Sequence, residues 1–105
     1  MFVAGEVRET APQESYALAR AALEEAERAA QVGDIAVCAG LMAKAAIATA
    51  HARLAERGAS AETEIGILRR AGLGRAEEIL AAVGTRPHDL SQSVLRMRIA
   101  LRLQT

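Results

Sequence analysis

The chain has 105 residues, of which 51% are hydrophobic and 2% aromatic, and its 13 basic residues balance its 13 acidic ones. This length suits one domain with a single core, and zero net charge gives no general attraction to nucleic acid or to an anionic membrane. The single cysteine, Cys38, excludes an internal disulfide, and its place in an apolar run predicts a buried small residue. Because helix-forming residues dominate and β-branched residues are sparse, the composition predicts an all-α domain.

The first ten residues lack periodicity, so we expect residues 1–10 to form an N-terminal arm and residues 11–105 to form one helical domain. The opening stretch MFVAGEVRETAPQ has no basic region followed by a long apolar segment, so we expect no signal peptide. The longest apolar run contains Gly40 and Lys44 and is not expected to span a membrane. A cytoplasmic protein is predicted.

The first helix is predicted from Pro12, which suits a first helical turn, to about Val32, with Gly33 as its end. Apolar residues recur along it every three or four positions, as in an amphipathic surface helix: Tyr16, Ala19, Leu23, Ala26 and Ala30.

Asp34 is a suitable N-cap for a second helix over residues 35–57, which Gly58 ends. This helix is apolar nearly all round, so we expect it to be buried on most sides. Either it is the central helix of a bundle, or one of its faces packs against a second subunit. Together the two helices form a long helical hairpin.

Lys44 and His51 interrupt the apolar run and lie two turns apart on one stripe. In one interpretation both are polar residues at the solvent edge of the bundle, the lysine keeping its amine in water. In the other, both line a groove in which a cation and an imidazole hold a phosphate or a ribose.

Ser60 predicts the start of a third helix over residues 61–71, which Gly72 ends. Ile65 and Leu68 are its apolar anchors. Arg69 and Arg70 close it, and they are interpreted either as bases that complement the helix dipole or as contacts for an anion.

A short fourth helix is predicted over residues 75–83, with Ile79, Leu80 and Val83 facing inward. The last helix is predicted to begin near Pro87 or Asp89. Its core-facing stripe consists of Leu90, Val94, Met97 and Leu101, widened by Leu95 and Ile99.

Short, glycine-marked connections favour antiparallel neighbours. The predicted fold class is therefore all-α, an antiparallel four- to five-helix bundle built on the long hairpin. Near the C-terminus four bases either complement a helix dipole or bind an anion: Arg86, Arg96, Arg98 and Arg102.

No catalytic or metal-binding motif is found. The GLGRAE segment has a Gly-x-Gly, but no strand precedes it and no third glycine follows, so it does not fit a dinucleotide loop. The two histidines are too far apart in sequence for a zinc motif. We expect no metal and no cofactor.

The segment YALARAALEEAERAAQVGDIAVCAGLMAKAAIATAHARLAERG resembles the first helical pair of HEPN-type domains and of the helical substrate-binding domains that accompany minimal nucleotidyltransferases. The segment AETEIGILRRAGL is similar to a stretch of the second group, where an Asn-Glu-Lys-type sequence leads into Arg-Arg-Ala-Gly-Leu; only Glu64 matches that type here. The resemblance covers about residues 15–85. It implies a four- or five-helix antiparallel bundle, often dimeric, with a role near nucleotides or RNA.

The HEPN ribonucleases carry an arginine separated from a histidine by four to six residues. Lys44 has this spacing from His51 but is the wrong cation, and an alanine or valine holds each such position before His88. We therefore expect no ribonuclease activity. A non-catalytic dimeric domain is predicted, contacting a nucleotide, an RNA or a partner such as a nucleotidyltransferase. The contact residues proposed are Lys44, His51, Arg69 and Arg70. The alternative is a pure protein-interaction module, such as a helical adaptor, an antitoxin-like subunit or a chaperone.

Overall fold

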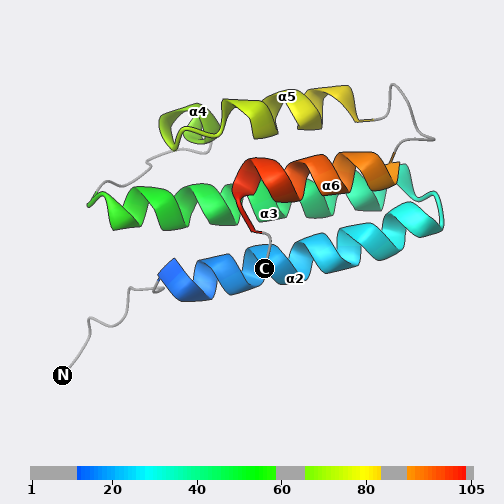
Figure 1. The fold of residues 1–105 in the computed structure, drawn as a ribbon, viewed down its shortest axis with the longest axis horizontal. Helices are drawn as coiled ribbons and strands as arrows, with labels where there is room; N and C mark the ends of the chain where they lie inside the picture. The colour runs from blue at the N-terminus through cyan, green and yellow to red at the C-terminus, as the bar shows by residue number, and fades with distance from the viewer. Residues whose placement is uncertain (1–11, 59–65, 84–89, 104–105) are drawn as a thin grey trace.

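The computed structural model describes residues 12–58, 66–83 and 90–103. These residues form five helices and no strand, which confirms the predicted all-α bundle. The helices are α2 (Pro12–Gln31), α3 (Ile35–Glu56), α4 (Ile67–Arg70), α5 (Gly74–Ala82) and α6 (Leu90–Leu101). Figure 1 shows that α2, α3, α5 and α6 run alternately in opposite directions, and that the short α4 lies next to α5 on the same side of α3. The predicted N-terminal arm lies outside the described residues.

The α2–α3 hairpin forms as predicted, and both helix ends at its turn are capped. Gly33 takes a left-handed φ of 76°, and its N–H donates to the Ala30 carbonyl while the Asp34 N–H donates to the Ala29 carbonyl. This double hydrogen bond is the Schellman motif that glycine favours at helix ends. The Asp34 side chain then accepts a hydrogen bond from the Val37 N–H at 3.2 Å, as an N-cap does.

Helix α3 is the centre of the bundle, because it contacts α2, α4, α5 and α6. Its buried residues include the predicted Cys38 and also Met42, Ala45, Ala46 and Thr49. The hydroxyl of Thr49 is satisfied by donating to the Ala45 carbonyl at 2.9 Å. The predicted central helix is therefore present, although its burial is incomplete.

The predicted third helix is wrong in extent. Gly66 has a left-handed φ of 75°, which no α-helix contains, and α4 therefore begins after it and is only four residues long. The predicted cap Ser60 and the anchor Ile65 lie outside the described residues. Helix α5 lies one residue earlier than expected, and Ile79, Leu80 and Val83 are partly buried against the core.

Helix α6 buries the predicted stripe of Leu90, Val94, Met97 and Leu101. The predicted widening of that stripe is wrong, because Leu95 and Ile99 are 48% and 51% exposed. At about 100° of rotation per residue, Leu95 and Ile99 lie well round the helix from that stripe, so they turn to solvent when the stripe packs on the core. The predicted starts at Pro87 or Asp89 lie outside the described residues.

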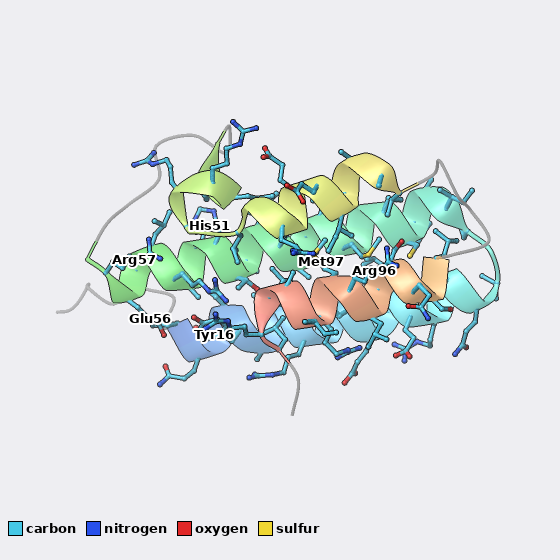
Figure 2. The ribbon with its side chains drawn as sticks, turned by 45° about the horizontal axis from the view of Figure 1, so that its top comes forward. Tyr16, His51, Glu56, Arg57, Arg96 and Met97 are labelled. Carbon is cyan, nitrogen blue, oxygen red and sulfur yellow. The ribbon has the colours of Figure 1, made fainter. Side chains whose placement is uncertain are left out.

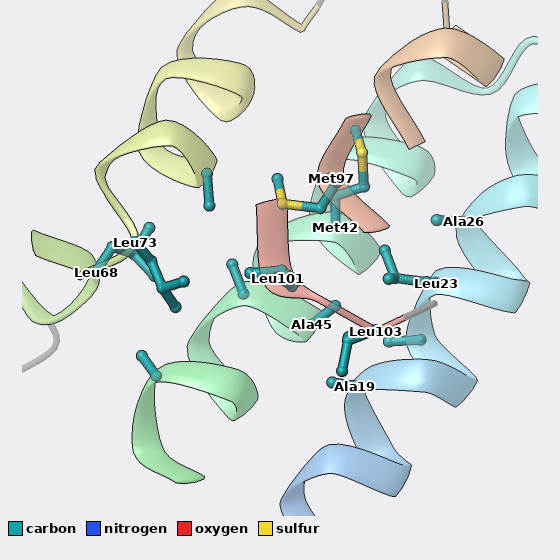
Figure 3. Packing of buried hydrophobic residues seen from close by; sticks show 14 of the residues in the cluster. Ala19, Leu23, Ala26, Met42, Ala45, Leu68, Leu73, Met97, Leu101 and Leu103 are labelled. Carbon is teal, nitrogen blue, oxygen red and sulfur yellow. The ribbon is translucent and has the colours of Figure 1, made fainter. Parts of the chain in front are cut away.

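The core joins the hairpin, whose buried side chains are mostly small apart from such residues as Leu23 and Met42, to large side chains of the other helices (Figure 3). Helix α2 contributes chiefly alanines and Leu23, whereas Leu68, Leu73, Met97 and Leu101 fill the space that α3 leaves on its other sides. Buried alanines let the backbones of α2 and α3 approach closely, which is how a hairpin with few bulky residues still packs.

Candidate binding surfaces

Lys44 and His51 both lie on the solvent side of α3, two turns apart. Seven residues of helix separate them by about 10 Å along its axis. Within the described part of the chain, no hydrogen bond or ion pair joins them or holds either one. Their exposure fits the solvent-edge interpretation.

They belong to a longer feature, which we call the open face of α3. Its exposed residues fall within about 100° of one another around the helix, so they share one side: Ala36, Val37, Gly40, Lys44, His51 and Ala55. Ile47 lies on the same side and is half-buried. Lys44 is its only permanently charged residue. Helix α3 alone, among the described helices, is long and apolar enough to span a membrane, yet only 39% of that apolar stretch is buried.

Gly40 lies within the open face and has no role inside the chain. A Cβ added there would meet no atom within 4 Å, and its backbone is ordinary helix. A glycine in a helix interior costs about 0.5–1 kcal/mol relative to alanine. Neither internal packing nor backbone conformation accounts for this cost.

Arg69 and Arg70 are both exposed. Arg69 forms an ion pair with an acidic side chain of the same chain. Its Nε donates to the Glu77 carboxylate of α5 at 2.7 Å. The carbonyls of Arg70 and Ala71 accept hydrogen bonds from Arg57 at the end of α3, at 3.1 and 3.3 Å. This cluster fixes α4 between α3 and α5, so the structure gives it a positioning role, and Figure 2 shows Arg57 at the end of α3.

A groove of about 810 Å³ lies between α5 and α6. Three arginines line it, Arg75 from α5, Arg96 from α6 and Arg102 just after α6, and we call it the arginine groove. Figure 2 shows Arg96 on α6 at the side that faces α5. The remaining lining is mainly apolar, and it includes Ile79 and Ile99. This explains why Ile99 is exposed: it forms part of a groove wall.

The charge in the arginine groove is not balanced. Among the described residues, Glu78 is the only acid that lines it, so the three guanidinium groups leave two positive charges in excess. In the described part of the chain no ion pair or hydrogen bond engages the three guanidinium groups. By contrast, Arg98 on another side of α6 pairs with Glu27 of α2 at 3.6 Å.

Arg102 also has an unusual backbone. Its φ of 58° is left-handed, and it is the only described residue besides glycines with a positive φ. Its N–H donates to the Ile99 carbonyl and the Leu103 N–H donates to the Arg98 carbonyl, so α6 ends in the Schellman motif seen at Gly33. An arginine in this glycine position is strained by about 1 kcal/mol or more.

Two further features of the described residues bear on reactivity: the Cys38 thiol and the grouping of metal-ligating side chains. Burial, with a smaller contribution from Asp34, raises the pKa of the Cys38 thiol, so the thiolate that a nucleophile requires is disfavoured. Among the described residues, no three His, Cys, Asp or Glu side chains are grouped as a metal site requires.

No protein-family model, curated protein or solved structure matches this chain. The resemblance to HEPN-type and nucleotidyltransferase-associated domains therefore stays a prediction. Sequence reasoning noted Arg96 and Arg102 as possible anion contacts but did not include Arg75. Their groove was not foreseen, because spacing within one helix does not tell which other helix will face it.

Proposed function

We propose that this chain is a non-catalytic helical module that works as a homodimer, paired through the open face of α3. The observation that carries the proposal is Gly40, a helix-interior glycine with open space around it on an apolar, solvent-facing helix side. Glycine and alanine on a helix face let a second helix approach to about 8 Å. A second copy of α3 would remove this surface from water and account for the glycine.

The spacing of the open face favours a second copy over an unrelated partner. If two α3 helices cross antiparallel with the twofold axis between Ile47 and Ala48, Gly40 of one lies opposite Ala55 of the other. Lys44 then lies opposite His51 of the partner subunit. The same patch is thus complementary to itself, as a twofold interface requires. No lysine faces another lysine, so the pairing avoids like-charge repulsion.

The mass in solution tests this proposal. At micromolar concentration, light scattering is expected to give twice the chain mass of 11.1 kDa. Gly40→Gln is expected to give the single-chain mass while its circular dichroism stays helical, because glutamine is the better helix former but its side chain blocks the close approach. The control Ala21→Gln, on the exposed side of α2, is expected to stay dimeric. A wild-type chain that runs only as 11.1 kDa would refute the proposal.

The proposal extends to a role for the dimer: it is of the HEPN or nucleotidyltransferase-partner type and contacts a nucleotide, an RNA or a partner enzyme. We call this extension the wider form of the proposal. The alternative is a pure interaction module without a small-molecule site. A nucleotide panel separates the two. A rise in melting temperature with one nucleotide supports the wider form, because a ligand that binds only the folded state stabilises it, and no response supports the pure interaction module.

A further inference from the structure

We propose that the arginine groove between α5 and α6 binds a small organic phosphate, a phosphate ester whose other part is apolar. This site is separate from the open face of α3, and the inference does not depend on the proposed dimer. It begins from the groove volume of about 810 Å³, which lies within the range of small-molecule sites in proteins.

The charge of the groove selects an anion. Arg75, Arg96 and Arg102 approach it from the end of α6 and from both of its helical walls. A guanidinium presents a planar set of N–H donors that matches a phosphate oxygen pair better than a lysine amine does. The excess of two positive charges equals the charge of a phosphate monoester near neutral pH.

The rest of the lining selects the body of the ligand. Ile79 and Ile99 provide apolar walls, one from each helix, on which a ring or hydrocarbon can pack. Glu78 and Ser93 also line the groove and can accept hydrogen bonds from a hydroxyl or an amine. The groove is therefore suited to an ester rather than to inorganic phosphate alone.

The strain at Arg102 is the second observation. Elsewhere in the described chain, α2 and α4 end in Schellman motifs with Gly33 and Gly72 in the left-handed position, whereas α6 has an arginine there. That arginine lines the groove. Strain of this kind often marks a functional position, and phosphate binding gives a reason for it here.

A small ligand fits these observations better than RNA does. The positive charge is confined to one groove between helices of nine and twelve residues, and the whole chain has no net charge. Proteins that bind nucleic acid strands show an extended basic surface.

Binding of 1-naphthyl phosphate to the full chain, measured by calorimetry, tests the proposal. It is expected to bind at least tenfold more tightly than either 1-naphthol or inorganic phosphate, and more weakly as salt is added. Arg96→Gln is expected to weaken binding at least tenfold. The matched control Arg20→Gln, on the exposed side of α2, is expected to leave it unchanged.

A second variant, Arg102→Gly, distinguishes loss of the binding site from loss of the fold. It is expected to melt at a higher temperature than wild type while binding 1-naphthyl phosphate more weakly, a combination that misfolding does not produce. The proposal is overturned if the naphthyl phosphate does not bind, if naphthol binds as well, if Arg20→Gln weakens binding as much as Arg96→Gln, or if a short single-stranded RNA binds more tightly. Gly40→Gln is expected to bind normally, so failure of the dimer and failure of this site are told apart.

Discussion

The α2–α3 hairpin and the α4–α6 half of the bundle build one core from different materials. Helix α2 buries four alanines, a serine and one leucine, so its contact with α3 depends on close backbones. The second half buries Ile67, Leu73, Met97 and Leu101, so its contact depends on large side chains that fill space. At its buried alanines the hairpin therefore loses stability when a side chain is enlarged, whereas the second half loses most when one of its large side chains is shortened.

Shortening a large residue of the second half is the severest test of this contrast. Leu101→Ala is expected to lower the free energy of unfolding by about 2–5 kcal/mol, because Leu101 is 1% exposed and its loss leaves a cavity. Urea denaturation measures the change. Leu95→Ala, on the exposed side of the same helix, is the control and is expected to change stability by less than about 0.5 kcal/mol. Equal losses from both variants would remove the contrast.

Enlarging a small residue of the hairpin is the converse test. Ala26 is fully buried in α2, so Ala26→Leu is expected to cost about 1–3 kcal/mol by forcing the two backbones apart. The same urea experiment measures it. Ala21→Leu makes the same change on the exposed side of α2 and is expected to be nearly neutral. If Ala26→Leu is also neutral, the hairpin is not close-packed in the way described.

Helix α6 of the second half has an arginine at the left-handed position where α2 has Gly33, and one substitution at each position tests that difference. Arg102→Gly is expected to raise the free energy of unfolding by about 1 kcal/mol, because it relieves a left-handed φ. Gly33→Ala is expected to lower it by about 1 kcal/mol for the opposite reason, since its surroundings are open and only the backbone conformation is penalised. Thermal melts of both variants check the signs. Changes of the same sign would contradict the role assigned to the left-handed positions.

The smallest effect concerns the open end of the hairpin, where the Tyr16 hydroxyl donates to the Glu56 carboxylate at 3.0 Å (Figure 2). Tyr16→Phe is expected to cost less than about 1 kcal/mol, because the hydrogen bond is exposed. Urea denaturation at neutral pH measures this cost.

The same hydrogen bond predicts a dependence on alkaline pH. Burial, followed by the hydrogen bond to Glu56, raises the pKa of Tyr16 above its ordinary value of 10.0. The folded chain therefore keeps the phenol proton where the unfolded chain releases it, and stability falls as pH rises above about 10. The Phe variant is expected to lose this part of the fall, and an identical pH profile for both proteins would count against the contact.

The sequence predicted the hairpin well because its signals are local. Gly33 and Asp34 mark the turn, and each acts within a few residues of itself. The third helix was mispredicted because Gly66 adopts a left-handed conformation, which a helical pattern does not reveal. Leu95 and Ile99 were misassigned because the width of a buried stripe depends on how many neighbours surround the helix, and that is a property of the whole bundle.

The candidate sites also differ in how much of them the sequence predicted. Helical spacing predicted that Lys44 and His51 share one stripe of the helix, and the structure shows both exposed on one side of α3. The ion pair of Arg69 with Glu77 and the meeting of Arg75, Arg96 and Arg102 both depend on which helices become neighbours. A single sequence holds no direct sign of that.

The most direct measurement of the paired α3 helices uses two cysteine variants, Lys44→Cys and His51→Cys. In the proposed antiparallel register, residue 44 of one chain lies opposite residue 51 of the partner, whereas two copies of residue 44 lie about 10 Å apart along the axis, beyond the reach of a disulfide. Mild oxidation of the two variants mixed together is therefore expected to give a disulfide-linked dimer, and oxidation of either variant alone is expected to give little. No linked dimer in the mixture, or as much from one variant alone, would contradict the account.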